Sequence, residues 1–226
     1  IVVNHKRISR IMRKYDLRSC LTRYRPKFRW AAKDEDGKVF KNHLSGTELT
    51  GVNQAWATDI TYIKLKREFV FLAAIIDIYS RMIVGWAISR KMDYILCMEA
   101  LIVALGKRNP PPGVIHHSDQ GTQYCSTEYI RYLKENGFTI SMSARGTPTE
   151  NGYIESFFKT LKYEEIFFHQ YETMQDVVGR LPNFIEEVYN SKRLHSSLGY
   201  QSPAEFEAKL AEEPVENAHI LRLASA

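Results

Sequence analysis

The sequence predicts an α/β fold, in which a mixed five-stranded sheet is flanked by helices and preceded by a basic helical segment. Three β-rich runs joined by tight turns occupy residues 54–88, the pattern of an antiparallel meander. Short apolar runs then alternate with helical periodicity over residues 93–161, as parallel α/β units require. Residues 1–30 carry ten Lys or Arg against one Asp, a net +9, which leaves −4 for residues 31–226.

The first three strands are defined by β-branched and aromatic residues. Residues 56–64, WATDITYIK, alternate polar and apolar side chains, which indicates a strand. Residues 69–78, FVFLAAIIDI, form an almost unbroken apolar run, which is typical of a central strand buried on both faces. Tight turns at residues 66–68 and 79–81 lead into this strand and into a third strand at residues 82–88.

Two helix–strand units follow the meander. Residues 93–107 place apolar side chains at helical spacing, and the sequence NPPPG at residues 109–113 ends this helix. Residues 114–117 form a short fourth strand. A second helix spans residues 126–136, and residues 139–143 form the fifth strand.

The next helix, within residues 143–165, has two distinct faces. Thr147 and Glu150 are spaced as a capping box at its start. Four apolar residues share the face that we expect toward the core: Ile154, Phe157, Phe158 and Leu161. The neighbouring face carries one carboxylate and two ammonium groups, from Glu155, Lys159 and Lys162. These groups could hold a metal ion and a polyanion together, or form surface ion pairs.

The chain ends with a helix at residues 173–189, bent at Pro182, and a short helix capped by Ser202 and Glu205. The tail, residues 209–226, is uninformative. The predicted order is therefore β-β-β-α-β-α-β-α-α, which is the ribonuclease-H-like order.

The basic segment, residues 1–30, is a candidate DNA-binding unit. Residues 4–15 have helical spacing of apolar and basic side chains, so they form either the end of a small helical DNA-binding unit or a solvated basic helix. Residues 24–30, YRPKFRW, alternate cations with aromatic rings, which suits phosphates and stacked bases. The candidate DNA contacts are Arg7, Arg10, Arg13, Lys14, Arg25, Lys27 and Arg29. Residues 31–52 are polar and glycine-containing, and we interpret them as a linker.

The cysteine spacing and the length of the apolar runs indicate the cellular compartment. The three cysteines, Cys20, Cys97 and Cys125, form no C-x-x-C pair, so we expect neither a zinc finger nor a disulfide framework, and a reducing cytoplasm. We find no apolar run that approaches 18 residues and no signal peptide, so no membrane association is expected. The chain opens on Ile1 rather than Met, so we expect a fragment or a trimmed chain.

Three acidic residues occupy positions typical of catalysis. Asp59 lies inside the first strand, Asp119 follows the fourth strand, and Glu155 lies on the helix after the fifth strand. In a ribonuclease-H-like arrangement the first and fourth strands are neighbours and this helix crosses near their ends, so the three carboxylates converge. Alone they would repel one another, and divalent cations relieve that repulsion. Their hard oxygen ligands suit Mg²⁺ or Mn²⁺, and two ions about 3.5–4 Å apart would bridge a phosphate.

These motifs resemble the DDE transposase and integrase family, on the side of the bacterial insertion sequences. Asp59 and Asp119 have 59 residues between them, and Asp119 and Glu155 have 35, which is the family's hallmark. Four sequence segments also resemble motifs of this family: WATDITYI, HHSDQGTQY, NGYIESFFKTLKYEE and YNSKRLHSSLGYQSPAEF. The resemblance implies an integrase catalytic core over residues 53–208 and a partial helix-turn-helix-like region over residues 1–30.

The resemblance also implies an activity and partners. The activity is metal-dependent DNA cleavage and strand transfer at the ends of an insertion sequence, with Asp59, Asp119 and Glu155 as metal-ligating catalytic residues. The partners are the element's terminal inverted repeats, target DNA, further copies of the chain on DNA, and a companion protein from the same element. Two alternatives stay open: a ribonuclease-H-like nuclease without strand transfer, and an inactive DNA-binding remnant.

Several other residues are weighed beside this triad. Lys159 and Lys162 are expected to contact the DNA backbone, and weaker candidates for DNA binding are Arg145, Asn151, His117, Arg193 and His195. His117 could orient a phosphate or simply pack, and Arg193 and His195 could instead pin the last helices. Asp77 is expected to fix a turn, and Glu150 to be held in its capping box. Trp56 and Tyr124 are expected in the core.

Overall fold

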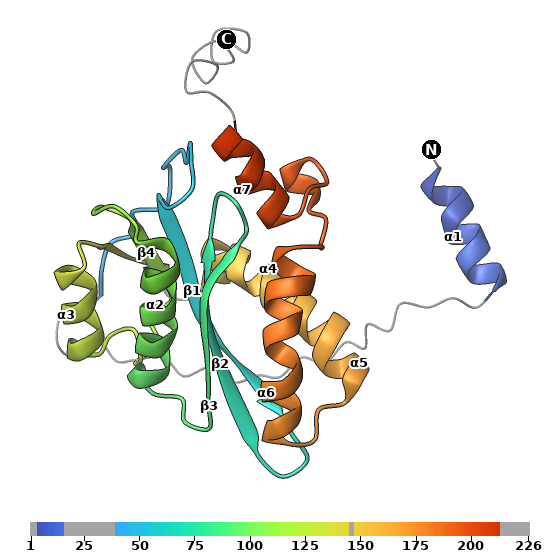
Figure 1. Cartoon of the computed structure of the whole chain (residues 1–226), viewed down its shortest axis with the longest axis horizontal. Helices are drawn as coiled ribbons and strands as arrows, with labels where there is room; N and C mark the ends of the chain where they lie inside the picture. The colour runs from blue at the N-terminus through green and yellow to red at the C-terminus, as the bar shows by residue number, and fades with distance from the viewer. Residues whose placement is uncertain (1–3, 16–38, 145–146, 213–226) are drawn as a thin grey trace, which may run out of the picture.

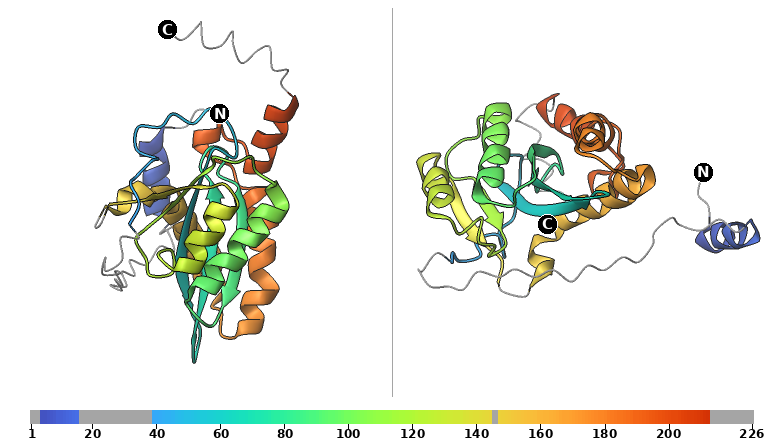
Figure 2. Two further views of the ribbon diagram at one scale, coloured as in Figure 1. Left: turned by 90° about the vertical axis from the view of Figure 1, so that its left-hand side faces the viewer. Right: turned by 90° about the horizontal axis from the view of Figure 1, so that it is seen from below.

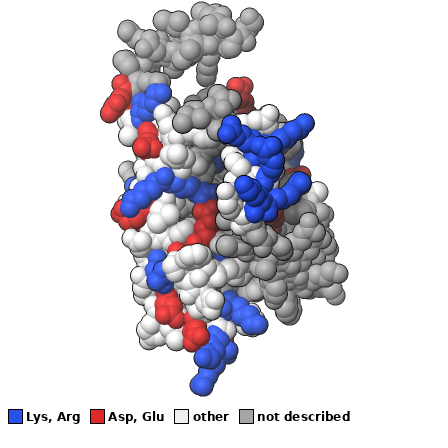
Figure 3. All heavy atoms as spheres, turned by 90° about the vertical axis from the view of Figure 1, so that its right-hand side faces the viewer, with Lys and Arg blue, Asp and Glu red and all other residues white. Residues whose placement is uncertain are grey.

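The computed structural model describes residues 4–15, 39–144 and 147–212. Helix α1 (His5–Lys14) is capped by Asn4, whose side chain accepts a hydrogen bond from the Lys6 backbone N–H. Lys and Arg make up half of α1, and over the rest of the face shown in Figure 3 basic and acidic side chains are interspersed. The predicted DNA contacts Arg25, Lys27, Arg29 and Arg145 lie outside the described residues.

The sheet has the predicted mixed topology. Its strands are β1 (Ala55–Lys64), β2 (Phe69–Asp77), β3 (Ile83–Ser89), β4 (Ile115–Ser118) and β5 (Thr139–Met142), in the spatial order β3-β2-β1-β4-β5. The pairs β1–β2 and β2–β3 are antiparallel, and the pairs β1–β4 and β4–β5 are parallel. The meander followed by parallel α/β units is therefore confirmed.

Helices cover both faces of this sheet (Figures 1 and 2). On one face α2 (Tyr94–Arg108) and α3 (Thr127–Glu135) bury Leu101 and Tyr129 against Trp56 of β1. On the other face α4 (Gly152–Leu161) and α6 (Met174–Asn183) bury Phe157 and Leu181 against β1 and β2. The interior strand β2 is thus buried on both faces, as its apolar run predicts.

Close approach of α2 to β3 depends on a glycine. A Cβ added at Gly85 would lie 2.3 Å from the Ala100 carbonyl oxygen and 2.7 Å from the Ala104 Cβ. Any larger residue would therefore push α2 away from the sheet.

The expected helix starts are also present, since Asp93 and Ser126 cap α2 and α3 through their side chains.

The start of α4 differs from the prediction. The Glu150 carboxylate accepts a hydrogen bond from the Ala144 backbone N–H at 2.7 Å, and the Thr147 hydroxyl donates to the Ala144 carbonyl at 2.6 Å. The predicted capping box is therefore wrong, because both side chains close the preceding turn instead. A 3₁₀ turn, η1 (Pro148–Asn151), leads into α4, which begins at Gly152.

Two π-helical turns interrupt the later helices. The turn η2 (Lys162–Ile166) joins α4 to the short α5 (Phe167–His169), and η3 (Phe184–Asn190) continues α6. Proline has no N–H to donate, so Pro182 leaves one carbonyl of α6 unbonded and the hydrogen-bond register shifts directly after it.

The chain closes with η4 (Ser196–Leu198) and α7 (Pro203–Glu212). The capping box predicted for α7 is confirmed, because Ser202 and Glu205 bond each other's backbone N–H groups at 3.2 and 2.8 Å.

Part of the predicted linker rests on the core. Leu44 and Leu49 pack against the core on the α4 side of the sheet, and Phe40 packs against the core on the α2 side. The His43 backbone N–H donates to the Ser141 hydroxyl of β5 at 2.8 Å. This part of the predicted linker therefore packs against the sheet domain and does not separate from it. No helix in the described part of the chain is long and apolar enough to span a bilayer.

Candidate active site

Strand register places Asp59 and Asp119 close together, just beyond the part of β1 that pairs with β4. The parallel pairing of β1 with β4 ends at Ala57 opposite His117. Asp59 and Asp119 each follow that last pair by two residues. Because side chains alternate with period two, both carboxylates leave the sheet on the face that carries Ala57 and α4.

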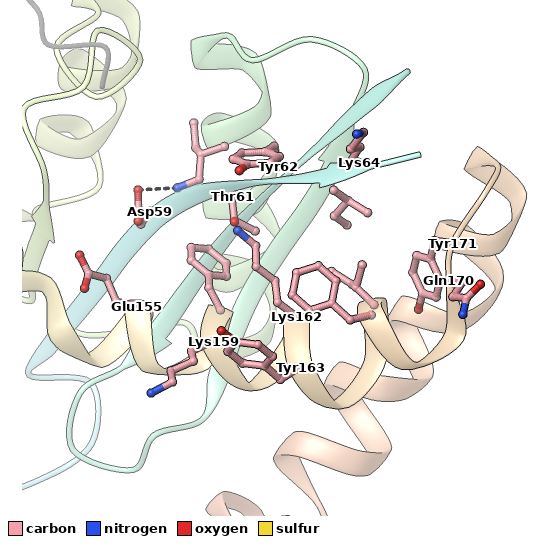
Figure 4. Close-up of a pocket in the computed structure, with 15 residues that line it drawn as sticks. Asp59, Thr61, Tyr62, Lys64, Glu155, Lys159, Lys162, Tyr163, Gln170 and Tyr171 are labelled. Carbon is pink, nitrogen blue, oxygen red and sulfur yellow. Dashed lines mark hydrogen bonds between the residues drawn. The ribbon is translucent and has the colours of Figure 1, made fainter. Parts of the chain in front are cut away.

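Glu155 reaches the same place from α4. Ile154 and Phe157 are fully buried beneath the helix, which fixes its rotation and leaves Glu155 at its exposed side. Figure 4 shows the Glu155 carboxylate on the side of α4 that faces Asp59 of β1. The three acids that sequence reasoning selected therefore come from the middle of β1, the end of β4 and the helix α4, which surround one site.

The pKa values of all three acids are raised. The pKa of Asp59 is raised to about 8, first by burial and then by the neighbouring charges of Asp119 and, more weakly, Glu155. The Ile60 N–H, at 2.7 Å from Asp59 Oδ1, opposes this shift. Burial also raises the pKa of Asp119, against a 2.9 Å hydrogen bond from the Gly121 N–H, and burial raises the pKa of Glu155. The site therefore favours protons or cations beside these carboxylates.

The donor set fits a hard divalent cation. Oxygen ligands of carboxylates are those that Mg²⁺ and Mn²⁺ prefer, and none of the three acids forms an ion pair with a described residue. Within the described ranges, no three His, Cys, Asp or Glu side chains already stand close enough to form a metal cage. Gathering them would require the cation itself to offset their repulsion.

A cleft of about 760 Å³ extends from the acids along β1. Asp59 and Glu155 lie at one end of it, and the strand residues from Ile60 to Lys64 form one wall. Residues of α4, η2 and α5 form the opposite wall (Figure 4). A polymer lying in this cleft would pass directly beside the carboxylates.

The two lysines of α4 and η2 line this cleft. Lys159 is exposed, whereas Lys162 is half-buried and its Nζ lies 4.6 Å from the centroid of the Tyr62 ring. Burial lowers the pKa of Lys162, and the negative charge of Asp59 raises it in opposition. Neither lysine forms an ion pair with a described residue, so the alternative of surface ion pairs with Glu155 does not describe this face.

Asn151 and His117 lie beneath the site. The Asn151 amide donates to the Thr58 carbonyl of β1 at 3.1 Å, which ties the start of α4 to the strand of Asp59. His117 Nδ1 lies 2.9 Å from the Ser141 hydroxyl, and burial lowers the pKa of this histidine. Both residues are buried, and Asn151 Oδ1 and His117 Nε2 have no hydrogen-bond partner in the described structure.

Two other candidates have structural partners. Arg193 forms an ion pair with Glu164 of η2, and the His195 ring packs edge-on against Tyr189 at 5.1 Å. These contacts fit the alternative in which both residues pin the last helices. The structure also confirms the turn role of Asp77, whose carboxylate accepts from the backbone N–H groups of Asn53, Tyr79 and Ser80.

Sequence reasoning missed the aromatic part of the cleft. Tyr62, Tyr163 and Phe167 line it, and none of them was a candidate. Tyr163 and Phe167 are four residues apart in a helical segment, a signal that indicates only a shared face. Their meeting with Tyr62 of β1 depends on the tertiary packing of α4 against the sheet.

Comparisons with known proteins agree with this architecture. Residues 50–148 and 136–203 each match a family model described as an integrase core domain. In the simian T-cell lymphotropic virus intasome in complex with PP2A regulatory subunit B56 gamma, a chain aligns over 78% of this chain and 60% of its own, with 17% identity and a TM-score of 0.61. The HTLV-2 integrase catalytic core in complex with magnesium aligns over 68% of this chain and 95% of its own, with 15% identity and a TM-score of 0.53. The fold is thus that of retroviral integrase cores.

A curated relative is closer in sequence. The transposase for insertion sequence element IS904 of Lactococcus lactis is 38% identical over 209 residues, which cover 92% of this chain and 81% of the relative. This chain belongs to the family of bacterial insertion-sequence transposases with a retroviral-integrase-like core, enzymes of DNA transposition.

Proposed function

We propose that Asp59, Asp119 and Glu155 are the metal-ligating catalytic carboxylates with which this transposase cuts DNA and joins it to a target. The observation that carries the proposal is the equal two-residue offset of Asp59 and Asp119 past the last β1–β4 pair, with Glu155 facing Asp59 from α4. The raised pKa of Asp59 supports it, because a site that repels its own negative charge is suited to cations.

The site would hold Mg²⁺ or Mn²⁺, two ions when DNA is bound, in line with the magnesium named for the HTLV-2 integrase core. When bound, the metal would supply Lewis-acid activation of the phosphate and of the attacking oxygen. Asp59, on which the charges of both other acids act, would contact both ions, and Asp119 and Glu155 would each hold one. Asn151 would keep the start of α4, and with it Glu155, against β1.

The reaction has two stages at the same carboxylates. Water first attacks a phosphodiester at the element's end and releases a 3′-hydroxyl. That hydroxyl then attacks a phosphodiester of target DNA, so one bond forms as another breaks, without a covalent bond to the protein. Lys159 and Lys162 would hold the phosphates beside the acids, and the basic face of α1 would contribute further backbone contacts.

The expected setting is the bacterial cytoplasm, on nucleoid DNA. Two element ends must react together, so we propose a homo-oligomer assembled on DNA. A companion protein from the same element would join that assembly.

The test is a joining assay with a labelled, pre-cut element end, target DNA and Mg²⁺ or Mn²⁺. Asp119→Asn is expected to lower the joining rate by at least about a thousandfold, because the chemistry depends on the cation that this oxygen holds. Glu99→Gln removes an equivalent charge from an exposed position on α2 and should leave the rate unchanged. Unaltered joining by Asp119→Asn would exclude the proposed role.

The same assay distinguishes strand transfer from the alternative function, cleavage alone. A ribonuclease-H-like nuclease would cut the uncut end in a manner that needs Asp119 but would yield no joined product from the pre-cut end. Joined product from the wild-type chain therefore decides between cutting alone and strand transfer.

A further inference from the structure

The first turn of α4 carries Glu155 but has little local definition. Asn151, the residue before the helix, forms no side-chain cap bond, and the helix begins at Gly152, a residue type with low helix propensity. The Glu150 and Thr147 side chains, which could have capped the helix, close the preceding turn instead. Contacts with other elements therefore fix this first turn, and whatever fixes the turn also fixes the direction of the Glu155 carboxylate.

A contact with the β2–β3 turn holds the side of α4 opposite the carboxylate. The guanidinium carbon of Arg81 lies over the Tyr153 ring, 4.2 Å from its centroid, which is a cation–π contact. Successive helix residues are about 100° apart, so Tyr153 and Glu155 point to nearly opposite sides of α4. Neither Tyr153 nor Arg81 lines the cleft. The contact therefore reaches α4 from its far side, away from the cleft.

Arg81 occupies a backbone position that suits glycine. Its φ is +63°, in the left-handed region, where a residue that has a Cβ is strained. The Arg81 N–H donates to the Asp77 carbonyl at 2.9 Å, which closes the turn between β2 and β3. Since glycine would make this turn without the strain, an arginine at this position points to a use of its side chain.

The described structure gives the Arg81 guanidinium no charged partner. Arg81 forms no ion pair with a described carboxylate, and its Nη1 is buried without a hydrogen-bond partner among the described residues. A partly buried cation without a carboxylate is costly, and the face of an aromatic ring offsets part of that cost. The stack on Tyr153 therefore holds the side chain in place, and the side chain in turn holds Tyr153.

We propose that Arg81 is a positioning residue for the reaction: its stack on Tyr153 fixes the first turn of α4 and thereby the Glu155 carboxylate. The proposal rests on the proposed function for the role of Glu155 as a metal ligand. Without the stack, the first turn of α4 loosens and the affinity of the site for its cation falls, while the three carboxylates themselves remain. A turn that contains none of the three acids thus supports the active site.

Amide hydrogen exchange in EDTA tests the positioning step without metal, DNA or catalysis. In an α-helix the N–H groups of residues 156–159 donate to the carbonyls of residues 152–155, so their exchange reports the first turn. Arg81→Gly and Tyr153→Leu should each speed exchange in this segment by about two- to fivefold, the equivalent of one cation–π contact, with α2 unchanged. Tyr153→Leu leaves the β2–β3 turn intact, so it tests the contact even if Arg81→Gly does not fold.

A joining assay over a range of Mn²⁺ concentrations tests the consequence for the active site. Both variants should raise the half-saturating Mn²⁺ concentration by about tenfold, the low end for groups that orient a metal ligand. The rate at saturating Mn²⁺ should stay within about threefold of wild type, because all three carboxylates are still present. A simple loss of folded protein would instead lower the rate at every Mn²⁺ concentration and leave the half-saturating value unchanged.

Three further variants define the contact. Tyr153→Phe keeps the ring and should retain both wild-type exchange and wild-type Mn²⁺ dependence. Tyr200→Gly removes the same kind of backbone strain, at a φ of +61°, from a residue that is 72% exposed, and should change neither signal. The double variant Arg81→Gly, Tyr153→Leu should be no worse than the more affected single variant, because both changes remove one contact.

Four outcomes would overturn the proposal. They are wild-type exchange of residues 156–159 in both single variants, an unchanged half-saturating Mn²⁺ concentration, effects that multiply in the double variant, or an equal effect of Tyr200→Gly. Failure of the proposed function gives a different result. The wild-type chain would then join no pre-cut ends at any Mn²⁺ concentration, while the faster exchange in Arg81→Gly and Tyr153→Leu, and its non-additivity, would remain.

Discussion

At the scale of single residues, the acids of the active site oppose the stability of the metal-free fold. The Asp59 carboxyl has a pKa of about 8 in the folded protein, against 3.8 for the ordinary group. The folded state therefore binds more protons than the unfolded state between these pH values, and the free energy of unfolding falls as pH rises through this window. At the proposed metal site the same repulsion would provide affinity for cations.

This gives a prediction for Asp59→Asn, since the amide resembles the protonated carboxyl. In EDTA at pH 8 the variant should be more stable than wild type by at least about 1 kcal/mol, a rise in Tm of about 2–4 °C, while joining activity is lost. At pH 3, below both pKa values, the two proteins should differ little. Urea unfolding at both pH values measures the change, with Glu99→Gln as control; a variant less stable at pH 8 would contradict the pKa assignment.

The three acids could be predicted because residue type and spacing alone distinguish them. Asp59 interrupts a strand of β-branched and aromatic residues, and Asp119 follows the fourth strand at the edge where open sheets bind ligands. The aromatic rings that line the cleft carried no such signal. Tyr62 and Phe167 have 104 residues between them, and ordinary core and surface positions hold the same residue types.

At the scale of elements, the periodicity of apolar residues was sufficient to predict the strands and helices, but it did not predict the junctions between them. The π-helical turn η3 directly follows Pro182, which has no N–H to donate, and it is also held by a distant strand. In η3, for example, the Asn190 side chain bonds both backbone groups of Ile83 in β3, at 2.9 and 3.0 Å. A period in the sequence contains no information about such a partner.

Asn190 therefore fixes η3 against the first residue of β3, and its loss should be costly. Asn190→Ala would leave the buried N–H and C=O of Ile83 without partners, which should lower the free energy of unfolding by about 2–4 kcal/mol. Asn136→Ala is a matched control, because that exposed amide also bonds a backbone carbonyl, Tyr132 at 2.9 Å, yet should cost less than about 0.5 kcal/mol. Equal Tm values for the two variants would show that the Asn190 bonds contribute nothing.

At the scale of the whole molecule, charge is divided between a basic arm and a near-neutral catalytic domain. The first 30 residues carry a net +9 and the remainder −4. Within α1 the basic side chains Arg7, Arg10 and Lys14 share one face, opposite the apolar residues Ile8 and Met12. Under the proposed function, the arm would provide general attachment to DNA, and Lys159 and Lys162 would position one phosphate.

Attachment by α1 predicts a specific change in salt dependence. The triple variant Arg7→Gln, Arg10→Gln, Lys14→Gln should reduce the slope of log K for duplex binding against log salt by about 2–3, because each phosphate contact contributes about 0.9. The control Arg131→Gln, Lys134→Gln, Lys209→Gln changes net charge equally on α3 and α7, outside the cleft, and should leave the slope near wild type. Fluorescence anisotropy over a range of KCl concentrations measures both. Equal losses of slope would mean that net charge, not the face of α1, attracts the DNA, and unchanged slopes would mean that α1 is a solvated helix.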